Sequence, residues 1–273
     1  MNIYSRLNRC HFLSSRVVSA RRIVTTADCG DNLVRITMAA EPVNSLNLQL
    51  MRKLKMAITA ANASSCDGIV LASSCRVFCA GLDLKELHGA SSENLAEFWT
   101  TFQELCQVLY SSNKFVVAEI GGHAPAAGTI ISLCCDMRIA VPGARVGLNE
   151  AALGLVCPTW ACEMMADNIG KRQAYSALSQ GLLLSTEEGL SMGLVDKLAE
   201  DKDQLMQKVH AECLQWTSKP GRSLLKAAIR GPIVNRWKQE QADDLQTFLR
   251  VLTMPETQQR IGDYLQSLTR AKK

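Results

Sequence analysis

Three short runs of apolar residues most constrain the fold of this 273-residue chain. They are Gly68–Ser73, Phe115–Ile120 and Met137–Val141, and none exceeds six residues. A short continuous apolar run is typical of a strand that is buried on both faces of a sheet. Stretches with helical spacing of apolar residues alternate with these runs, at 93–112, 126–135, 160–180 and 186–192. The alternation predicts an α/β fold in which helices pack on a sheet.

The chain divides into three regions by pattern. Residues 28–200 carry the alternation and are expected to form the α/β core. From about residue 202 the pattern becomes helical, so we expect a helical C-terminal region over 201–273. Gly231-Pro232 and Pro255 interrupt this region and predict separate helices at 220–230, 238–253 and 255–269.

Residues 1–27 differ in composition from the rest of the chain. They contain five arginines and four serines, and no acidic residue precedes Asp28. This is the composition of a transit peptide, which predicts import into the mitochondrial matrix. A disordered basic tail is the alternative interpretation.

Charge, cysteines and hydrophobicity exclude several classes of protein. The formal net charge of the chain is +4, but residues 28–273 sum to about −1, so no nucleic-acid partner is expected. The eleven cysteines include no Cys-x-x-Cys pair and no histidine at metal spacing. We therefore expect buried thiols and no metal. No apolar run approaches the roughly twenty residues of a membrane span.

Two turns carry candidate hydrogen-bond donors. Phe78–Leu84 has the pattern of a buried strand followed by a tight turn at Gly81, which leaves the N–H of Leu82 free of a ladder. The turn over 121–128 precedes an apolar helix, and the first N–H groups of a helix lack internal partners. Two such donors aimed at one point form an oxyanion hole. On spacing alone, two ordinary tight turns remain an equal alternative.

A single glutamate favours the catalytic interpretation. Glu150 lies in an apolar, small-residue run from Gly147 to Leu155, with no cation beside it in the sequence. Burial there would raise its pKa, which suits a general base that works near neutral pH. The alternative is an exposed loop carboxylate, the state of most glutamates.

These motifs resemble the crotonase (enoyl-CoA hydratase/isomerase) superfamily. The resemblance rests on the Ala-Gly-Leu-Asp turn at 80–83, the Pro-Ala-Ala-Gly turn at 125–128 and the run from Gly147 to Trp160. It extends over nearly the whole chain after residue 27. The Gly-Leu-Asn-Glu sequence at 147–150 is most similar to the mitochondrial Δ3,Δ2-enoyl-CoA isomerase branch.

The resemblance implies a fold, a ligand and a set of site residues. The fold is a crotonase-like ββα spiral core with a C-terminal helical region used in trimer packing. The ligand is an acyl-CoA substrate, so coenzyme A enters with the substrate and no cofactor is expected. Glu150 is implied as the base, and the N–H groups of Leu82 and Ala127 as the oxyanion donors. The residues implied to line the thioester and CoA are Cys79, Ala80, Gly81, Leu82, Asp83, Ala127 and Asn149.

Two positions need comment. The second oxyanion donor of the family usually belongs to a glycine, and Ala127 stands there, which requires a negative φ. If φ were positive, Gly128 would be the donor instead.

Ile130 stands where the enoyl-CoA hydratases have the first of two glutamates. A hydratase activates water and protonates carbon, whereas moving a double bond needs one base.

The resemblance therefore implies an isomerase that converts 3-enoyl-CoA, cis or trans, to trans-2-enoyl-CoA in the β-oxidation of unsaturated fatty acids. Another crotonase reaction, hydration or thioester hydrolysis, is the alternative enzymatic interpretation. A non-catalytic member that binds RNA or serves in assembly is the third.

Overall fold

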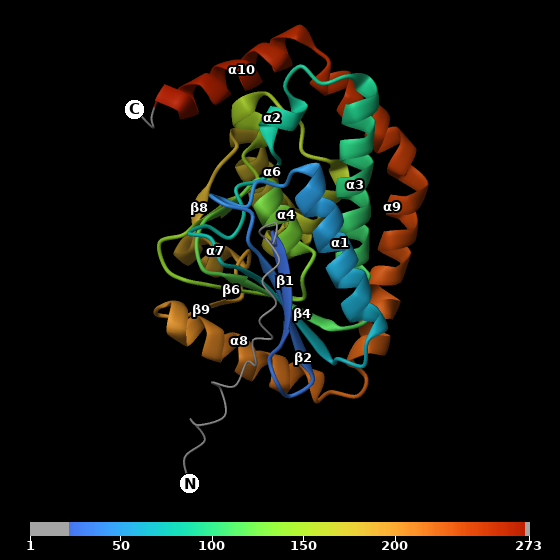
Figure 1. The fold of residues 1–273 in the computed structure, drawn as a ribbon, viewed down its shortest axis with the longest axis vertical. Coiled ribbons are helices and arrows are strands. Elements are labelled where there is room, and N and C mark those ends of the chain that lie inside the picture. Colours follow the sequence, from blue (N-terminus) through green and yellow to red (C-terminus); the bar gives the residue numbers. More distant parts are fainter. Residues whose placement is uncertain (1–21, 271–273) are drawn as a thin grey trace, which may run out of the picture.

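A six-stranded sheet forms the centre of the computed structural model, which describes residues 22–270 (Figure 1). Its strand order is β1-β2-β3-β4-β6-β9, with β1 antiparallel to β2 and every other pair parallel. The strands are β1 Val24–Asp28, β2 Leu33–Met38, β3 Gly68–Ser73, β4 Phe115–Ile120, β6 Met137–Ala140 and β9 Lys197–Leu198. The three apolar runs of the sequence are thus central strands β3, β4 and β6.

The edge strand β1 was not expected from the sequence. It begins at Val24, so the folded core starts before residue 28. Its side chains are mostly exposed, which explains why the strand has no apolar signature. The remainder of the predicted transit peptide, residues 1–21, lies outside the described residues.

Helices cover both faces of the large sheet. Ile69 and Leu71 of β3 face one core with α1 (Leu48–Ala63) and α3 (Ser92–Tyr110). Val70 and Ala72 face a second, smaller core, which α8 (Lys202–Thr217) closes. Because strand side chains alternate between the faces, burial on both sides requires the continuous apolar runs seen in the sequence.

A second sheet is small and stands at the carboxyl ends of the central strands. It contains β5 (Ala124–Pro125), β7 (Arg145–Gly147) and β8 (Leu184–Ser185). β5 and β7 are parallel, and β8 is antiparallel to β7. The short helices around it are α2 Leu84–Leu87, α4 Ala127–Leu133, η2 Glu150–Leu153 and α7 Thr186–Met192.

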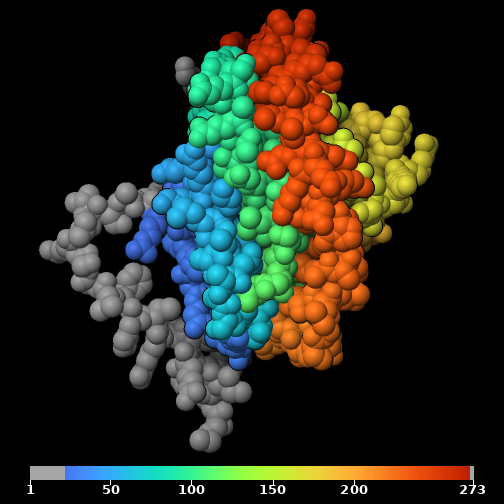
Figure 2. Space-filling view, turned by 90° about the vertical axis from the view of Figure 1, so that its right-hand side faces the viewer, coloured from blue at the N-terminus to red at the C-terminus, as the bar shows by residue number. Residues whose placement is uncertain are grey.

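The C-terminal helices fold back over their own chain. Helix α9 (Arg222–Leu252) runs along α3, which in turn lies beside α1 (Figure 2). The final helix, α10 (Pro255–Arg270), crosses above α2 (Figure 1). Within residues 22–270, no helix combines the length and hydrophobicity needed to cross a membrane.

Two predicted helix boundaries are wrong. Helix α9 continues through Gly231-Pro232, although a proline removes one helical hydrogen bond. Buried side chains after the proline, Val234 and Trp237, hold the helix against the core, so packing overrides the break. Conversely, 160–180 forms two helices, α5 (Thr159–Ile169) and α6 (Lys171–Gln180). Gly170 separates them, because its φ of 83° leaves the helical region.

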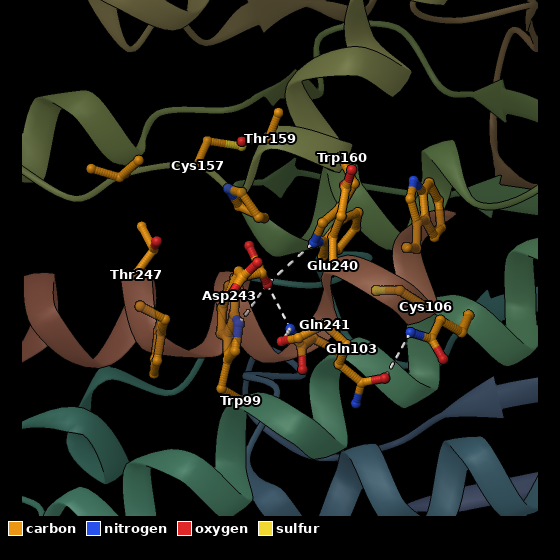
Figure 3. A pocket seen from close by; sticks show the side chains of 16 residues that line it. Trp99, Gln103, Cys106, Cys157, Thr159, Trp160, Glu240, Gln241, Asp243 and Thr247 are labelled. Carbon is orange, nitrogen blue, oxygen red and sulfur yellow. Dashed lines mark hydrogen bonds between the residues drawn. The ribbon is translucent and has the colours of Figure 1, made fainter. Parts of the chain in front are cut away.

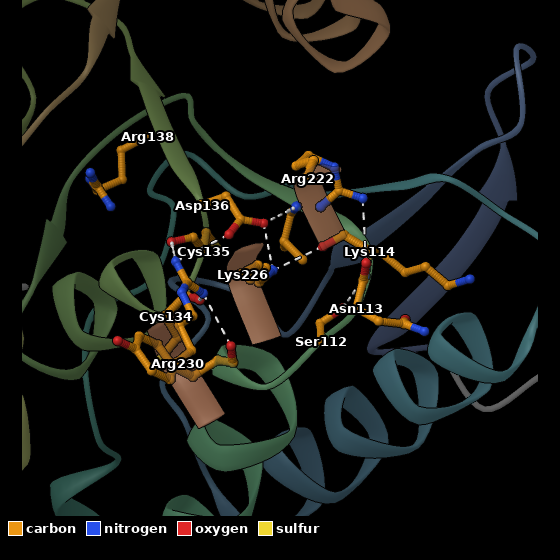
Figure 4. A network of polar contacts seen from close by, with 12 residues as sticks. Ser112, Asn113, Lys114, Cys134, Cys135, Asp136, Arg138, Arg222, Lys226 and Arg230 are labelled. Carbon is orange, nitrogen blue, oxygen red and sulfur yellow. Dashed lines mark hydrogen bonds and ion pairs between the residues drawn. The ribbon is translucent and has the colours of Figure 1, made fainter. Parts of the chain in front are cut away.

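A buried charged network anchors the start of α9 to the amino end of the sheet (Figure 4). Lys226 Nζ lies 2.6 Å from Oδ2 of Asp136, and Arg230 Nη2 lies 3.1 Å from its Oδ1. Arg230 also donates to the carbonyl oxygens of Tyr110 and Cys134. Burial lowers the pKa of Lys226 to about 8, which outweighs the opposing effect of Asp136. The network fixes α9 from its first turns.

Candidate active site

The first predicted donor, the N–H of Leu82, is free. Leu46 pairs with this turn as an isolated parallel bridge, in which its N–H donates to the carbonyl of Gly81 at 2.8 Å. The N–H of Asp83 donates to the carbonyl of Leu46 at 3.1 Å. The bridge therefore uses the residues on either side of Leu82, and the Leu82 N–H has no acceptor among the described residues.

The second predicted donor, the N–H of Ala127, is also free. Ala127 is the first residue of α4, so its N–H has no helical partner. The positive φ of this turn, 51°, belongs to Ala126, whose N–H donates to the carbonyl of Gly147 at 2.8 Å. Ala127 itself is not among the described residues with positive φ. The condition that would have moved the donor to Gly128 is therefore not met.

The two turns lie against each other because glycines stand at their contacts. A Cβ on Gly81 would be 3.6 Å from the nitrogen of Ala127. A Cβ on Gly128 would be only 2.4 Å from the carbonyl oxygen of Cys79. The carbonyl of His123 also accepts from the N–H of Phe78 at 2.9 Å. The free N–H groups of Leu82 and Ala127 thus belong to adjacent turns, as an oxyanion hole requires.

The small sheet joins the segment that leads to Glu150 to the second of these turns. Parallel pairing of β5 with β7 sets Pro125 opposite Gly147, and Glu150 begins η2 three residues later. Thr129 of α4 reinforces the pairing, since its Oγ1 accepts from the N–H of Gly147 at 2.7 Å. The same hydroxyl donates to the carbonyl of Ala124 at 2.5 Å. Strand pairing and Thr129 together fix the position of the base relative to Ala127.

The environment of Glu150 suits a general base. Burial raises the pKa of its carboxyl to about 7, partly offset by a hydrogen bond from its own N–H. Its Oε2 is buried without a hydrogen-bond partner, and no described lysine or arginine pairs with it. A carboxylate with pKa near 7 and an unoccupied oxygen is able to accept a proton at neutral pH. Glu150 is therefore not the exposed loop carboxylate that was the alternative interpretation.

No second carboxylate accompanies Glu150 at the expected position. Ile130 is buried, at 2% exposure, in the first turns of α4. Its side chain is part of the main core. The position at which hydratases are expected to have a glutamate is therefore apolar in this chain.

The other predicted lining residues differ in accessibility. Ala80, Asp83 and Asn149 are half-buried, whereas Cys79 is fully buried. Burial raises the pKa of the Cys79 thiol to about 12, so it stays protonated at neutral pH. Asp83 caps α2, because its Oδ1 accepts from the N–H of Lys85 at 3.1 Å. That these residues line an acyl-CoA site stays a prediction.

Three features near the site were missed at the sequence level. Thr129 and Asn44 are buried polar residues; Nδ2 of Asn44 donates to the carbonyl of Phe78 at 3.0 Å and to Ser73. Polar residues inside apolar patterns are the only signal for them.

The third feature is α10, where Gln258 accepts from the N–H of Gly89 at 2.8 Å and Arg260 lies against Gly154. This helix covers both α2 and η2.

A cavity of about 420 Å³ opens between α3, α9 and residues 156–160 (Figure 3). Leu82, Ala127 and Glu150 do not line it. No three His, Cys, Asp or Glu side chains within residues 22–270 gather in a way that would hold a metal ion.

Helices packed on a mixed sheet, two free N–H groups on adjacent turns and a glutamate with raised pKa are the features expected of enzymes that form an enolate or transfer an acyl group. The family model for enoyl-CoA hydratase/isomerase matches residues 28–267, and the chain belongs to this family. It is an enzyme with the crotonase fold, as the motifs predicted.

Several relatives in this family are isomerases. Mitochondrial enoyl-CoA delta isomerase 1 of Mus musculus is 32% identical over 98% of this chain and 95% of its own length. The Homo sapiens protein of the same name is 33% identical over 94% of this chain and 87% of its own length. The crystal structure of human mitochondrial delta3-delta2-enoyl-CoA isomerase superimposes with a TM-score of 0.89 at 32% identity, over 92% of this chain and all of that one.

A hydratase of the family is similar at a lower level. The crystal structure of an enoyl-CoA hydratase from Bacillus halodurans superimposes with a TM-score of 0.82 at 26% identity, over 89% of this chain and all of that one. The fold is therefore common to both reactions, and the site residues must distinguish them.

Proposed function

We propose that this protein is a Δ3,Δ2-enoyl-CoA isomerase, which converts cis or trans 3-enoyl-CoA to trans-2-enoyl-CoA in the oxidation of unsaturated fatty acids. The observation that carries the proposal is the carboxylate of Glu150, with its pKa raised to about 7 by burial and an Oε2 without a hydrogen-bond partner, together with the free N–H groups of Leu82 and Ala127. The names of the relatives at about one-third identity support the same reaction.

The reaction follows from these groups. The thioester oxygen of the substrate accepts hydrogen bonds from Leu82 and Ala127, which lowers the pKa of the C2 proton. Glu150 removes that proton, and the electron pair of the C–H bond delocalises over the thioester oxygen and the C3=C4 bond as a dienolate. Glu150 then returns the proton to C4, which leaves the double bond between C2 and C3. One base therefore completes the cycle.

Ile130 argues against hydration as the main reaction. Adding water requires a group that activates the water and another that protonates carbon, and an isoleucine side chain does neither. Crotonyl-CoA, the short conjugated thioester, is the substrate that tests this alternative.

The decisive experiment compares the wild type with Glu150→Gln, a substitution that keeps shape and removes the base. The wild type is expected to convert 3-hexenoyl-CoA to the conjugated 2-enoyl thioester, followed by its ultraviolet absorbance. The variant should lose at least about 10³-fold in kcat, because one general acid–base group typically contributes about 10²–10⁴-fold to the rate. Full activity in the variant, or faster hydration of crotonyl-CoA than isomerisation, would refute the proposal.

We also propose the mitochondrial matrix as the location. The arginine-rich, acid-free composition of residues 1–27 supports it, as do the mitochondrial relatives. Fusion of residues 1–23 to a fluorescent protein tests it, because the first strand begins at Val24. A fusion that stays in the cytosol would contradict the proposal.

A homotrimer is the third part of the proposal. The first turns of α9 expose three large apolar side chains, Leu224, Leu225 and Ile229, at 76%, 63% and 59%. An exposed apolar group of this kind is typical of a subunit interface. Light scattering after size exclusion tests it: the wild type should have three times the mass of a monomer, and Leu225→Glu with Ile229→Glu should dissociate it.

A further inference from the structure

The cavity between α3, α9 and residues 156–160 is lined largely by aromatic side chains. Three of the four tryptophans of the chain, Trp99, Trp160 and Trp237, contribute to it together with Phe248. The rings of Trp99 and Phe248 stack with centroids 4.0 Å apart, and those of Trp160 and Trp237 are 5.2 Å apart. Aromatic faces carry partial negative charge, so a group of them attracts a cation.

Carboxylates complete the lining. Asp244 lies in the wall of the cavity, and Glu240 and Asp243 are exposed residues that also line it (Figure 3). No lysine, arginine or histidine is among the lining residues, and no described cation forms an ion pair with these three carboxylates. The negative charge of the cavity is therefore uncompensated within residues 22–270.

Hydrogen bonds hold Asp244 in place without neutralising it. Its Oδ2 accepts from Nε1 of Trp99 at 2.8 Å, from Nε2 of Gln103 at 2.6 Å and from Nε1 of Trp160 at 3.4 Å. All three donors are neutral groups, so they add no positive charge beside the carboxylate. The arrangement joins α3, α5 and α9 around one fixed anion.

Gln103, a residue of the cavity lining, has one acceptor without a partner. Its side chain is 3% exposed, and its Nε2 donates to Asp244 and to the carbonyl of Gln241 at 3.1 Å. Its Oε1 is buried and has no hydrogen-bond partner. A buried acceptor without a donor costs about 1–3 kcal/mol, so the fixed position of Gln103 beside Asp244 is maintained at a cost in stability.

We infer that this cavity binds a protonated alkylamine. The ammonium group would donate to Oδ1 of Asp244, since the hydrogen bonds from Trp99, Gln103 and Trp160 all use Oδ2, while its alkyl chain packs against the aromatic side chains. A volume of about 420 Å³ is within the range of small-molecule sites. The alternative occupant is a neutral alkyl chain, such as the end of an acyl group, which would use the aromatic walls but not the charge.

The test uses intrinsic tryptophan fluorescence of the full chain in a Trp216→Phe background. Trp216 is the one tryptophan that does not line the cavity, so the remaining signal comes from the proposed site. The probes are hexylammonium and its neutral counterpart 1-hexanol, titrated at pH 7. Hexylammonium is expected to bind at least about tenfold more tightly, and raised salt should weaken it but not the alcohol.

Two variants isolate the charge. Asp244→Asn keeps an oxygen for the three N–H donors and should weaken hexylammonium about tenfold while leaving 1-hexanol unchanged. Glu240→Gln with Asp243→Asn changes only exposed residues, preserves the fold and should weaken hexylammonium several-fold. Glu256→Gln, an exposed charge loss outside the cavity, is the matched control and should have no effect.

The result that overturns the inference is equal affinity for the amine and the alcohol, or amine affinity that none of the cavity variants alters. Tetramethylammonium separates the two contributions: it retains the charge but has no N–H, so it should bind more weakly than methylammonium. Glu150→Gln should retain amine binding. The inference and the proposed isomerase activity therefore succeed or fail independently.

Discussion

Thr129 and Gly147 are joined by a hydrogen bond of 2.7 Å, in which the backbone N–H of Gly147 donates to the threonine hydroxyl. This bond connects the helix that begins with Ala127 to the strand that leads to Glu150. The bond links the segment that carries the Ala127 N–H to the segment that carries Glu150. The distance between this oxyanion donor and the base therefore depends on it.

Thr129→Val should therefore reduce both stability and activity. Valine has nearly the same shape, but it removes the hydroxyl that accepts from the N–H of Gly147 and donates to the carbonyl of Ala124. The expected loss is about 1–3 kcal/mol in the free energy of unfolding, measured by urea titration, with a lower kcat for 3-hexenoyl-CoA. Thr129→Ser keeps the hydroxyl and should retain most of both properties.

The pH dependence of the isomerase rate should follow Glu150. The base must be ionised, and burial raises the pKa of this carboxyl to about 7. Log kcat/KM should therefore rise by one unit per pH unit below about 7 and level off above it. A rate that is constant from pH 5 to pH 8 would contradict the role of Glu150.

The same pKa predicts that Glu150→Gln stabilises the protein at high pH. The folded-state pKa, about 7, is above the unfolded value of 4.5, so the folded state binds more protons between these values. Stability conferred by the protonated carboxyl is complete below pH 4.5 and is lost as the pH rises through 7. The variant should match the wild type at pH 4 and exceed it at pH 8 by up to about 3 kcal/mol. Thermal unfolding at the two pH values measures the difference, and equal stability at both contradicts the raised pKa.

Gly128→Ala should damage the site by steric conflict. The added Cβ would be 2.4 Å from the carbonyl oxygen of Cys79, closer than any van der Waals contact permits. The turns that carry Leu82 and Ala127 must separate, at an expected cost of about 2 kcal/mol or more in stability and a clear loss of activity. Gly231→Ala is the matched control: it meets nothing within 4 Å in the middle of α9, and should stabilise by about 0.5–1 kcal/mol.

Ala126→Gly should stabilise the second turn. Ala126 has φ 51° and ψ −125°, a conformation that glycine adopts with less strain than an L residue. The expected gain is about 0.5–2 kcal/mol, seen as a higher urea midpoint. Ala127→Gly makes the same chemical change one residue later, within the helix, and should instead lose about 0.5–1 kcal/mol. A loss in both variants would show that the turn is not strained at Ala126.

Much of the fold could be predicted because its signals are local. The continuous apolar runs of β3 and β4 identify central strands, since only burial on both faces requires them. The edge strand β1 has exposed side chains and therefore no such signal. Helix α9 was predicted as two helices because the sequence contains Pro232 but does not contain the packing of Trp237 that holds the helix together.

By itself, the sequence determined the chemical groups of the site: the glycine turns that free two N–H groups, a lone Glu150, and Ile130 in place of a second carboxylate. Tertiary structure decided their relationship. Pairing of β5 with β7 joins the segment that leads to Glu150 to the turn before Ala127, and the positive φ of this turn belongs to Ala126, not to Ala127. Burial, rather than a neighbouring charge, raises the pKa of Glu150. The cavity formed by Trp99, Gln103 and Asp244 has no sequence signature, because its residues come from helices more than a hundred positions apart and only packing brings them together.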